Sequence, residues 1–485
     1  MEDKKNAKIT KNYIKNVIKI KKSTEKRISK RDLNNQNIVE KCNKKIVKQS
    51  KNDIEILNKI NEFNTNGKKT IAYFIDSYFP VIDGVVSVLD NYAKFMSNYF
   101  NVVVCTPKHK KKTYKAESYF VLGANSMHLK SQGYDLGFPQ FDNKFLNYIS
   151  LLKIDLVHVN APFSMGLFGL DLAKKRKIPS ITTFHSQFRQ DFYKATNSEL
   201  LSKIMSNTII KLYDKSTVTV TMNDFSIKIM KKYGLKRNDV KVIPNATNLT
   251  YKEFEQKNER EVLNKYKIKN DKFTLLYIGR FVKVKNVYLI LDVLKELFKV
   301  NKNFQFVFLG YGPEEDKMKK IIKENKLENN IIFTGKILDS DEKSIIIKNS
   351  DLLFFPSDYD TDGIVKIECA CYAVPTLTIE NTGVASEIEN NDTGFIEKND
   401  VQILTNKIDE LSKNVDFVKI IGQNAKERLY ITWEDVGKKL LVLYNDLMKK
   451  KNVKISKNKK KKSGEWITHH FLLEFWVYFY WLKAN

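Results

Sequence analysis

The stretch DLLFFPSDYDTDGIVKIECACYAVP, residues 351–375, decides the fold class of this chain. It begins with DLLFFPS, which is mostly apolar and predicts a short buried strand. IVKIECACYAV then predicts a short helix that ends before Pro375, because the residue before a proline disfavours helical geometry. An acidic turn with Asp358, Asp360 and Asp362 lies between them. A strand, a turn and a helix in this order form one unit of a parallel α/β sheet.

Short apolar runs of this kind alternate with helical stretches along most of the chain, in two series. The first series is TIAYFID (70–76), FNVVVCTP (100–107), YFVLGA (119–124), DLVHVN (155–160), PSITTFH (179–185), TVTVTM (217–222) and VKVIPNA (240–246). The second is FTLLYIGR (273–280), FQFVFLG (304–310), IIFTG (331–335), DLLFFPS (351–357) and PTLTIEN (375–381). Such runs are typical of parallel strands covered on both faces. We therefore expect an α/β protein with two Rossmann-like, doubly wound domains that face a cleft.

Composition divides the chain into five expected segments. Residues 1–66 form a basic extension that is partly disordered and partly helical, and residues 67–250 form the first Rossmann-like domain. A polar, lysine-rich stretch marks the boundary to the second domain, residues 251–430. Residues 431–449 are expected to form a helix that returns to the first domain, and residues 450–485 are a basic and then aromatic tail.

The formal net charge of +28 favours anionic partners, namely nucleic acid, acidic lipid or phosphorylated substrates. Much of this charge lies in lysine runs at the two ends, which a solvated flexible arm explains equally well. The four cysteines are scattered and form no zinc-binding pattern, so we expect reduced thiols in a cytosolic protein. The basic N-terminus has no apolar core, and we do not expect a secretory signal.

The tail between Trp466 and Leu482 is apolar and aromatic, interrupted by His469, His470 and Glu474. It is slightly short for a membrane span of about 20 residues. Tryptophan and tyrosine prefer the lipid–water interface, so an interfacial segment behind the polylysine run is one interpretation. An incidental tail and packing against the body of the protein are the alternatives.

Candidate functional residues follow the predicted strands, because ligands of such sheets bind at the carboxyl ends of the strands. Arg280 and Lys285 follow the first strand of the second domain and would suit a pyrophosphate. Gly84 precedes a helix in the first domain, where backbone amides can approach a ligand. His185 ends another strand. Solvated surface cations and a structural histidine are the alternative interpretations.

The three aspartates of the acidic turn are compatible with a calcium loop, a catalytic divalent metal site or a set of acceptors for sugar hydroxyls. A calcium loop counted from Asp358 has its required glycine at Gly363, but its twelfth position is Cys369, and Glu368 falls one residue early. A D-x-D metal site belongs to a single-domain glycosyltransferase of another fold. Both metal interpretations are therefore disfavoured.

In the order of their motifs, residues 68–448 resemble the family-four retaining nucleotide-sugar glycosyltransferases with the GT-B fold. GRFVKVKN resembles the G-R-x-x-x-x-K phosphate clamp of that family, and PSDYDTDGIVKIECACYAVP resembles its E-x7-E segment. NTGVASEIENNDTGF resembles the G-G-x-x-E segment that follows. The resemblance implies that the first domain binds the acceptor and the second binds the nucleotide-sugar.

The resemblance also implies roles for individual residues. Arg280 and Lys285 would bind the donor diphosphate, Asp360 the transferred sugar and Glu368 the ribose hydroxyls. The implied donor-binding set is Gly84, Gly279, Arg280, Lys285, Gly310, Asp360, Gly363, Ile364, Val365 and Glu368. The implied catalytic set is His185, Asp360, Arg280 and Lys285.

The chain departs from the family pattern at several positions. Asp360 is one methylene shorter than the usual glutamate, so either a loop shift brings it to the sugar or Asp362 substitutes for it. Cys371 and Val374 replace small residues, including the usual glycine before Pro375, and are expected to alter donor choice or lower activity.

FIDSYFP and FHSQFRQDFY resemble most the members that glycosylate membrane lipids, such as diacylglycerol glucosyltransferases and phosphatidylinositol mannosyltransferases. The implied acceptor-side residues are Asp76, Phe188, Arg189 and Tyr193. The expected reaction is transfer of a hexose, with retention, from a donor of the UDP-glucose or GDP-mannose type to a lipid hydroxyl. A polysaccharide precursor or soluble acceptor is the alternative, and a non-catalytic nucleic-acid-binding protein is a remote one.

No metal and no other cofactor are expected, because Arg280, Lys285 and helix N-termini would stabilise the leaving diphosphate. The expected partners are the nucleotide-sugar and an anionic membrane surface, which puts the enzyme on the inner face of the cytoplasmic membrane. Nucleic acid is not expected, because the aromatic residues lie in apolar runs and the tail rather than among the lysines.

Overall fold

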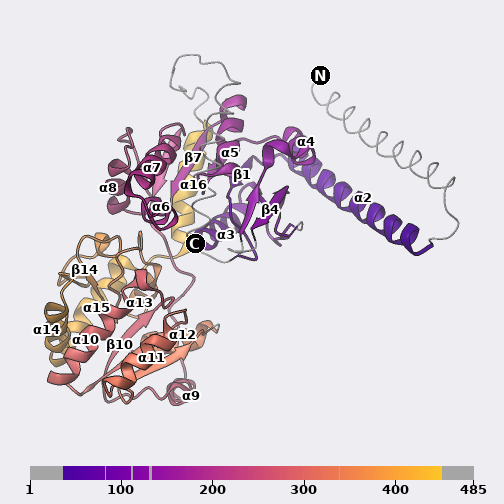
Figure 1. Cartoon of the computed structure of the whole chain (residues 1–485). Helices are drawn as coiled ribbons and strands as arrows, with labels where there is room; N and C mark the ends of the chain where they lie inside the picture. The colour runs from indigo at the N-terminus through magenta and orange to yellow at the C-terminus, as the bar shows by residue number, and fades with distance from the viewer. Residues whose placement is uncertain (1–35, 82–83, 111–112, 130–133, 338, 450–485) are drawn as a thin grey trace.

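The computed structural model describes residues 36–449 of the chain, except residues 82–83, 111–112, 130–133 and 338 (Figure 1). The basic N-terminal run and the aromatic tail at 466–482 lie outside these residues.

The first sheet contains seven parallel strands in the order β3-β2-β1-β6-β7-β8-β9. Their bounds are β1 (Thr70–Phe74), β2 (Asn101–Pro107), β3 (Phe120–Ala124), β6 (Leu156–Val159), β7 (Ser180–Phe184), β8 (Val218–Thr221) and β9 (Lys241–Val242). Each of them lies within one of the seven apolar runs of the first series. β1, β2, β6 and β7 are buried along their whole length, as expected for parallel strands covered on both faces, so none of them shows the apolar–polar alternation of a half-exposed strand.

Helices and one hairpin complete the first domain. The helices are α3 (Gly84–Ser97), α4 (Asn143–Leu151), α5 (Ser164–Arg176), α6 (Phe188–Thr196), α7 (Glu199–Tyr213) and α8 (Asp224–Lys232), with the 3-10 turn η1 (Pro139–Phe141). The antiparallel hairpin of β4 (Ser126–Leu129) and β5 (Tyr134–Gly137) was not predicted from the sequence. Its strands have only four residues each and carry little periodic signal.

The second sheet contains six parallel strands in the order β12-β11-β10-β13-β14-β15. Their bounds are β10 (Phe273–Ile278), β11 (Phe304–Leu309), β12 (Ile331–Gly335), β13 (Leu352–Phe354), β14 (Thr376–Ile379) and β15 (Phe395–Glu397). The helices are α9 (Gln256–Tyr266), α10 (Val287–Val300), α11 (Glu315–Glu324), α12 (Ser340–Lys348), α13 (Ile364–Ala370), α14 (Val401–Lys413) and α15 (Val415–Leu429), with the 3-10 turns η2 (Lys283–Lys285) and η3 (Val384–Glu387). Only β15, three residues long, was missed. The predicted fold class, two Rossmann-like domains, is confirmed.

The last described helix, α16 (Trp433–Lys449), leaves the second domain and packs against α3 in the first (Figure 1). Tyr444 anchors it, because its hydroxyl lies 2.9 Å from the hydroxyl of Tyr73 and 2.5 Å from Nδ1 of His158. Burial lowers the pKa of His158 to about 3, so this imidazole is neutral at physiological pH. A neutral polar network therefore joins the C-terminal helix to the centre of the first sheet.

The N-terminal helix α2 (Gln36–Thr65) extends away from the first domain in Figure 1 and contacts it through its C-terminal half, where Asp53 also pairs with Lys144 of α4. Ile60 and Phe63 of its last turns are 3% and 6% exposed and belong to the core beneath β1 and β2. These turns are therefore part of the first domain, although the sequence placed all of residues 1–66 in an extension. None of the helices within the described residues combines the length and apolar content needed to cross a membrane.

Gly422 of α15 offers a test of the packing between α15 and the turn that leads into β14. A Cβ atom at this position would lie 1.9 Å from the carbonyl oxygen of Ala373, which is backbone and cannot rotate away. Gly422→Ala is therefore expected to lower the free energy of unfolding by about 1–3 kcal/mol. Helix propensity alone would favour alanine over glycine by about 1 kcal/mol. The steric clash therefore predicts a less stable protein, and helix propensity alone predicts a more stable one.

Chemical denaturation of the full chain would measure this change. The exposed neighbour provides a matched control, because Gln423→Ala is expected to stay within about 0.5 kcal/mol of the wild type. A Gly422→Ala protein as stable as the wild type would contradict the packing.

Candidate active site

The acidic turn after β13 is one place where the second domain touches the first. The carbonyl oxygen of Tyr359 accepts a hydrogen bond from Nε2 of Gln187 at 3.1 Å. The carbonyl oxygen of Thr361 accepts one from Nδ2 of Asn223 at 2.7 Å, and its hydroxyl donates to the carbonyl oxygen of His185 at 2.9 Å. All three partners in the first domain follow strand ends or begin helices at the carboxyl edge of its sheet. The carboxyl edges of the two sheets therefore meet at this turn, as ligand binding between them requires.

Lys285 and Asp360, which the sequence assigned to phosphate and to sugar, are in direct contact. The ammonium of Lys285 forms an ion pair with both carboxylate oxygens of Asp360. The two side chains are only 19% and 22% exposed, so water screens the pair incompletely. Asp360 therefore lies beside one residue of the predicted phosphate clamp, while the carboxylate of Asp362 is buried against Lys366.

Arg280, the other member of the clamp, is exposed, and no hydrogen bond or ion pair of its guanidinium is described for residues 36–449. It follows β10 directly, next to Gly279. The loop after β11 approaches the same point, since a Cβ atom on Gly310 would lie 1.9 Å from the carbonyl oxygen of Gly279. Gly310 also has a φ of +151°, so glycine is required there for two reasons. The two glycine turns and Arg280 thus form one continuous surface at the end of the second sheet.

The remaining predicted donor residues lie at helix starts or on α13. Gly84 opens α3 and is exposed, with open space around its Cα. Gly363 precedes α13 with a φ of +78°, and Ile364 and Val365 form the first turn without a side-chain cap among the described residues. Glu368 lies further along α13 and forms an ion pair with Lys343 of α12 at 2.7 Å. The role of Glu368 towards ribose stays a prediction, and Lys343 is a partner that the sequence did not suggest.

Asp362 belongs to a buried charge cluster beneath the turn. Its carboxylate lies 2.8 Å from the ammonium of Lys366, which also contacts Glu387 at 2.7 Å. The side chains of Asp362 and Lys366 are 2% and 1% exposed. Burial alone would raise the pKa of Asp362 and lower that of Lys366, but their opposite charges reverse both directions. Burial and the charge of Asp362 raise the pKa of Glu387 to about 7.

This geometry makes Asp362 a structural residue that holds the turn. The carboxylate of Asp362 is buried and paired with Lys366, whereas that of Asp360 is partly exposed and paired with Lys285. Contact of Asp360 with the transferred sugar stays a prediction.

His185 lies at the end of β7 and is 8% exposed. Its Nε2 is 3.1 Å from Oδ1 of Asn160, which follows β6. Burial lowers the pKa of His185 to about 3, so the ring is neutral at physiological pH and can offer a hydrogen bond but no charge. Nδ2 of Asn160, after β6 in the first domain, and Oγ of Ser357, after β13 in the second, are both buried without a hydrogen-bond partner among the described residues. Such unpaired atoms are costly unless a ligand or water satisfies them, which marks Asn160 and Ser357 as candidate site residues that the sequence analysis missed.

Asp76 follows β1 and is 3% exposed. Its carboxylate accepts hydrogen bonds from the start of α5, among them 2.7 Å from the amide of Met165 and 3.1 Å from the hydroxyl of Ser164. Burial raises the pKa of Asp76 to about 6, although these bonds oppose the shift. In this structure the carboxylate therefore caps a helix.

The other three acceptor-side predictions lie on α6. Phe188 is buried against Phe163 and Phe184. Arg189 packs over the ring of Tyr233 at 4.5 Å, with its side chain turned towards α7 and α8. Tyr193 is 48% exposed. Of the four, Tyr193 presents the most surface to a partner, and contact of any of them with an acceptor stays a prediction.

Comparison with known proteins agrees with this geometry. The sequence profile of the glycosyl transferases group 1 matches residues 258–428, and that of Glycosyltransferase Family 4 matches residues 82–251. The chain belongs to the GT-B glycosyltransferases. The resemblance noted in the sequence is thereby confirmed, and so is the prediction of an enzyme.

Two curated relatives of this glycosyltransferase are alpha-monoglucosyldiacylglycerol synthases. That of Acholeplasma laidlawii is 26% identical over 400 residues, which cover 80% of this chain and 99% of the relative. That of Streptococcus pneumoniae (strain ATCC BAA-255 / R6) is 23% identical over 390 residues, covering 78% and 85%. Among solved structures, Anabaena Alr3699/HepE in complex with UDP has a TM-score of 0.61 at 15% identity and covers 78% of this chain and 100% of its own. This last similarity concerns the fold.

The buried cluster beneath the turn predicts a large effect of Lys366 on stability. Lys366→Met removes the one cation that the structure describes between Asp362 and Glu387 and leaves two buried carboxylates to be protonated or solvated. We expect a loss of about 3–5 kcal/mol of unfolding free energy in the second domain. Thermal and chemical unfolding would measure it.

Lys398→Met, at an exposed position of the same domain, is the control and is expected to have little effect. Adding Glu387→Gln to Lys366→Met should recover part of the loss. Equal stability of Lys366→Met and Lys398→Met would show that the cluster contributes nothing.

Proposed function

We propose that this glycosyltransferase transfers a hexose from a nucleoside-diphosphate sugar, of the UDP-glucose or GDP-mannose type, to the hydroxyl of a membrane lipid such as diacylglycerol, with retention of anomeric configuration. The observation that carries the proposal is the contact between Lys285 and Asp360 at the junction of the two domains. It joins a cation suited to a diphosphate and a carboxylate suited to sugar hydroxyls in one place.

The proposed reaction depends on positively charged side chains that already lie in the donor site before the nucleotide-sugar binds. Arg280 and Lys285 would stabilise the negative charge that develops on the leaving diphosphate. Lys285 is now neutralised by Asp360, so donor binding would place the ammonium between the carboxylate and a phosphate oxygen. These cations would do the work that a metal does in other transferases, and we propose that the transfer needs none.

Proton transfer in this proposal does not require a protein base. The leaving phosphate oxygen would accept the proton of the acceptor hydroxyl on the same face of the sugar, which gives retention. His185 is neutral and buried, which suits a hydrogen bond to the sugar rather than removal of a proton. Contact of the turn at Tyr359 and Thr361 with the first domain would help to exclude water from the donor.

The lipid acceptor is supported by the relatives named as alpha-monoglucosyldiacylglycerol synthases and by the net charge of +28. A positive surface would favour an anionic membrane by about 1 kcal/mol for each lysine near it. A peripheral location on the inner leaflet follows from this proposal. A polysaccharide precursor or soluble acceptor is the alternative, and it shares the same donor site.

The donor assignment can be tested with Arg280→Ala in a screen of nucleotide-sugars that measures nucleotide release. We expect kcat/KM to fall by about 10²–10³-fold, as for loss of one preorganised donor at a developing charge. Lys283→Ala is the matched control, because Lys283 is an exposed cation of the same loop. An Arg280→Ala protein as active as the wild type and as Lys283→Ala would contradict the assignment of Arg280 to the donor site.

The acceptor assignment can be tested by flotation of the full chain with vesicles and by extraction of labelled hexose. We expect flotation with anionic vesicles that weakens as salt rises, and a product that partitions into organic solvent when diacylglycerol is present. Water-soluble product without flotation at low salt would support the alternative acceptor instead. Tight RNA binding without nucleotide release would favour the remote alternative of a nucleic-acid-binding protein.

A further inference from the structure

Three metal-ligating side chains meet at the edge of the first domain, on residues that the proposed transfer does not use. His109 follows β2, His128 lies on β4 and Asp135 lies on β5. Nδ1 of His109 bonds to one carboxylate oxygen of Asp135, and Nδ1 of His128 lies 3.0 Å from the other. We call these three residues the His–Asp cluster.

The geometry of the His–Asp cluster is near that of a transition-metal site. One ligand atom from each residue lies within 4.8 Å of the other two. The imidazole rings stand edge to face with centroids 5.4 Å apart, and the Nδ1 atoms of both contact the carboxylate of Asp135. Zinc takes nitrogen and carboxylate oxygen ligands at about 2.0–2.2 Å, so small side-chain rotations would suffice to enclose an ion.

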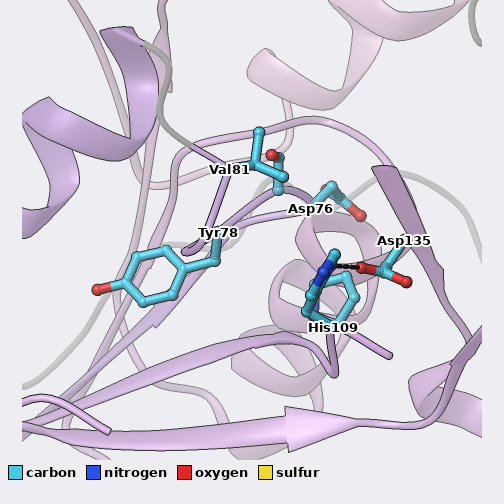
Figure 2. Close-up of a pocket in the computed structure, with 7 residues that line it drawn as sticks. Asp76, Tyr78, Val81, His109 and Asp135 are labelled. Carbon is cyan, nitrogen blue, oxygen red and sulfur yellow. Dashed lines mark hydrogen bonds and ion pairs between the residues drawn. The ribbon is translucent and has the colours of Figure 1, made fainter. Parts of the chain in front are cut away.

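The surroundings leave room for a further ligand. His109 and Asp135 line a small cavity with Asp76, Ser77 and Tyr78 (Figure 2). Asp76 is occupied as the cap of α5, so it is not counted as a ligand. Oγ of Ser77, in contrast, is buried and has no hydrogen-bond partner among the described residues. This hydroxyl in the cavity lining is a polar group that a bound ion with its water could satisfy.

The competing explanation is that the two histidines only donate hydrogen bonds to the carboxylate of Asp135 and bind no ion. Asp135 is 8% exposed, so its carboxylate needs partners in either case. The two explanations differ in whether an added ion binds and stabilises the protein.

We propose that the His–Asp cluster binds one divalent transition-metal ion, which ties the β4–β5 hairpin to the end of β2. Two imidazoles and a carboxylate suit Zn²⁺ and neighbouring ions better than Mg²⁺ or Ca²⁺, which prefer all-oxygen sites. The site uses none of the proposed donor residues, so it is compatible with a transfer that needs no metal. Its function would be structural.

Zn²⁺ is the probe for the test, titrated by calorimetry into the full-length protein after treatment with a chelator. His469 and His470 lie outside the described residues and are adjacent histidines, so the H469A/H470A protein serves as the background. We expect one equivalent of Zn²⁺ to bind, Co²⁺ to give the absorption of a four- or five-coordinate site, and Zn²⁺ to raise the melting temperature.

His128→Ala and Asp135→Asn in this background are each expected to weaken Zn²⁺ binding by at least about 10–100-fold, the loss seen when even outer-shell partners are removed. Asp171→Asn, at an exposed carboxylate of the same domain, is the matched control and should bind like the background. Circular dichroism and nucleotide release would show that the variants are folded. The proposal would be overturned if the background protein bound no Zn²⁺, or if His128→Ala, Asp135→Asn and Asp171→Asn bound it equally. The cluster would then be a set of hydrogen bonds without an ion.

Discussion

The buried cation of Lys366 is the interaction on which the site depends. A lysine that is 1% exposed can remain charged only if carboxylates surround it, and here Asp362 and Glu387 do so. Asp362 belongs to the acidic turn, and Glu387 lies in η3 after β14. The cluster therefore joins the turn to the neighbouring loop and directs Asp360, two residues earlier, towards Lys285. As a result, Asp360 and Asp362 pair with two different lysines, one partly exposed and one buried.

A second constraint is the double connection between the domains. The turn at Tyr359 and Thr361 makes hydrogen bonds across the junction, and α16 crosses back to pack on α3. The first contact consists of a few hydrogen bonds, each worth about 1 kcal/mol net. The second buries Tyr444 in a neutral network with Tyr73 and His158. The two domains are therefore joined at two separate places, one at the acidic turn and one along α16.

Much of the fold could be predicted from the sequence, because parallel strands that are buried on both faces have short, mostly apolar sequences without alternation. All seven runs of the first series and all five of the second contain strands of the two sheets. The hairpin β4–β5 and the strand β15 were missed, since three or four residues carry too little pattern. In the site, Arg280, Lys285, Asp360 and His185 could be located by their place after strands. The partners Lys343 and Asn160 could not, because they come from elements distant along the chain, and the burial of the Asp362–Lys366 pair, four residues apart, depends on the surrounding fold.

The sequence by itself determined the strand and helix order, the two Rossmann-like domains and the family to which the chain belongs, because these depend on local patterns and on motifs in a fixed order. Only the tertiary structure decided which aspartate of the acidic turn pairs with Lys285, that His185 is a buried neutral ring, and that His109, His128 and Asp135 form a cluster. The physical reason is the same in each case. Charge, burial and ligand geometry depend on neighbours that are distant along the chain, and folding alone brings them within bonding distance.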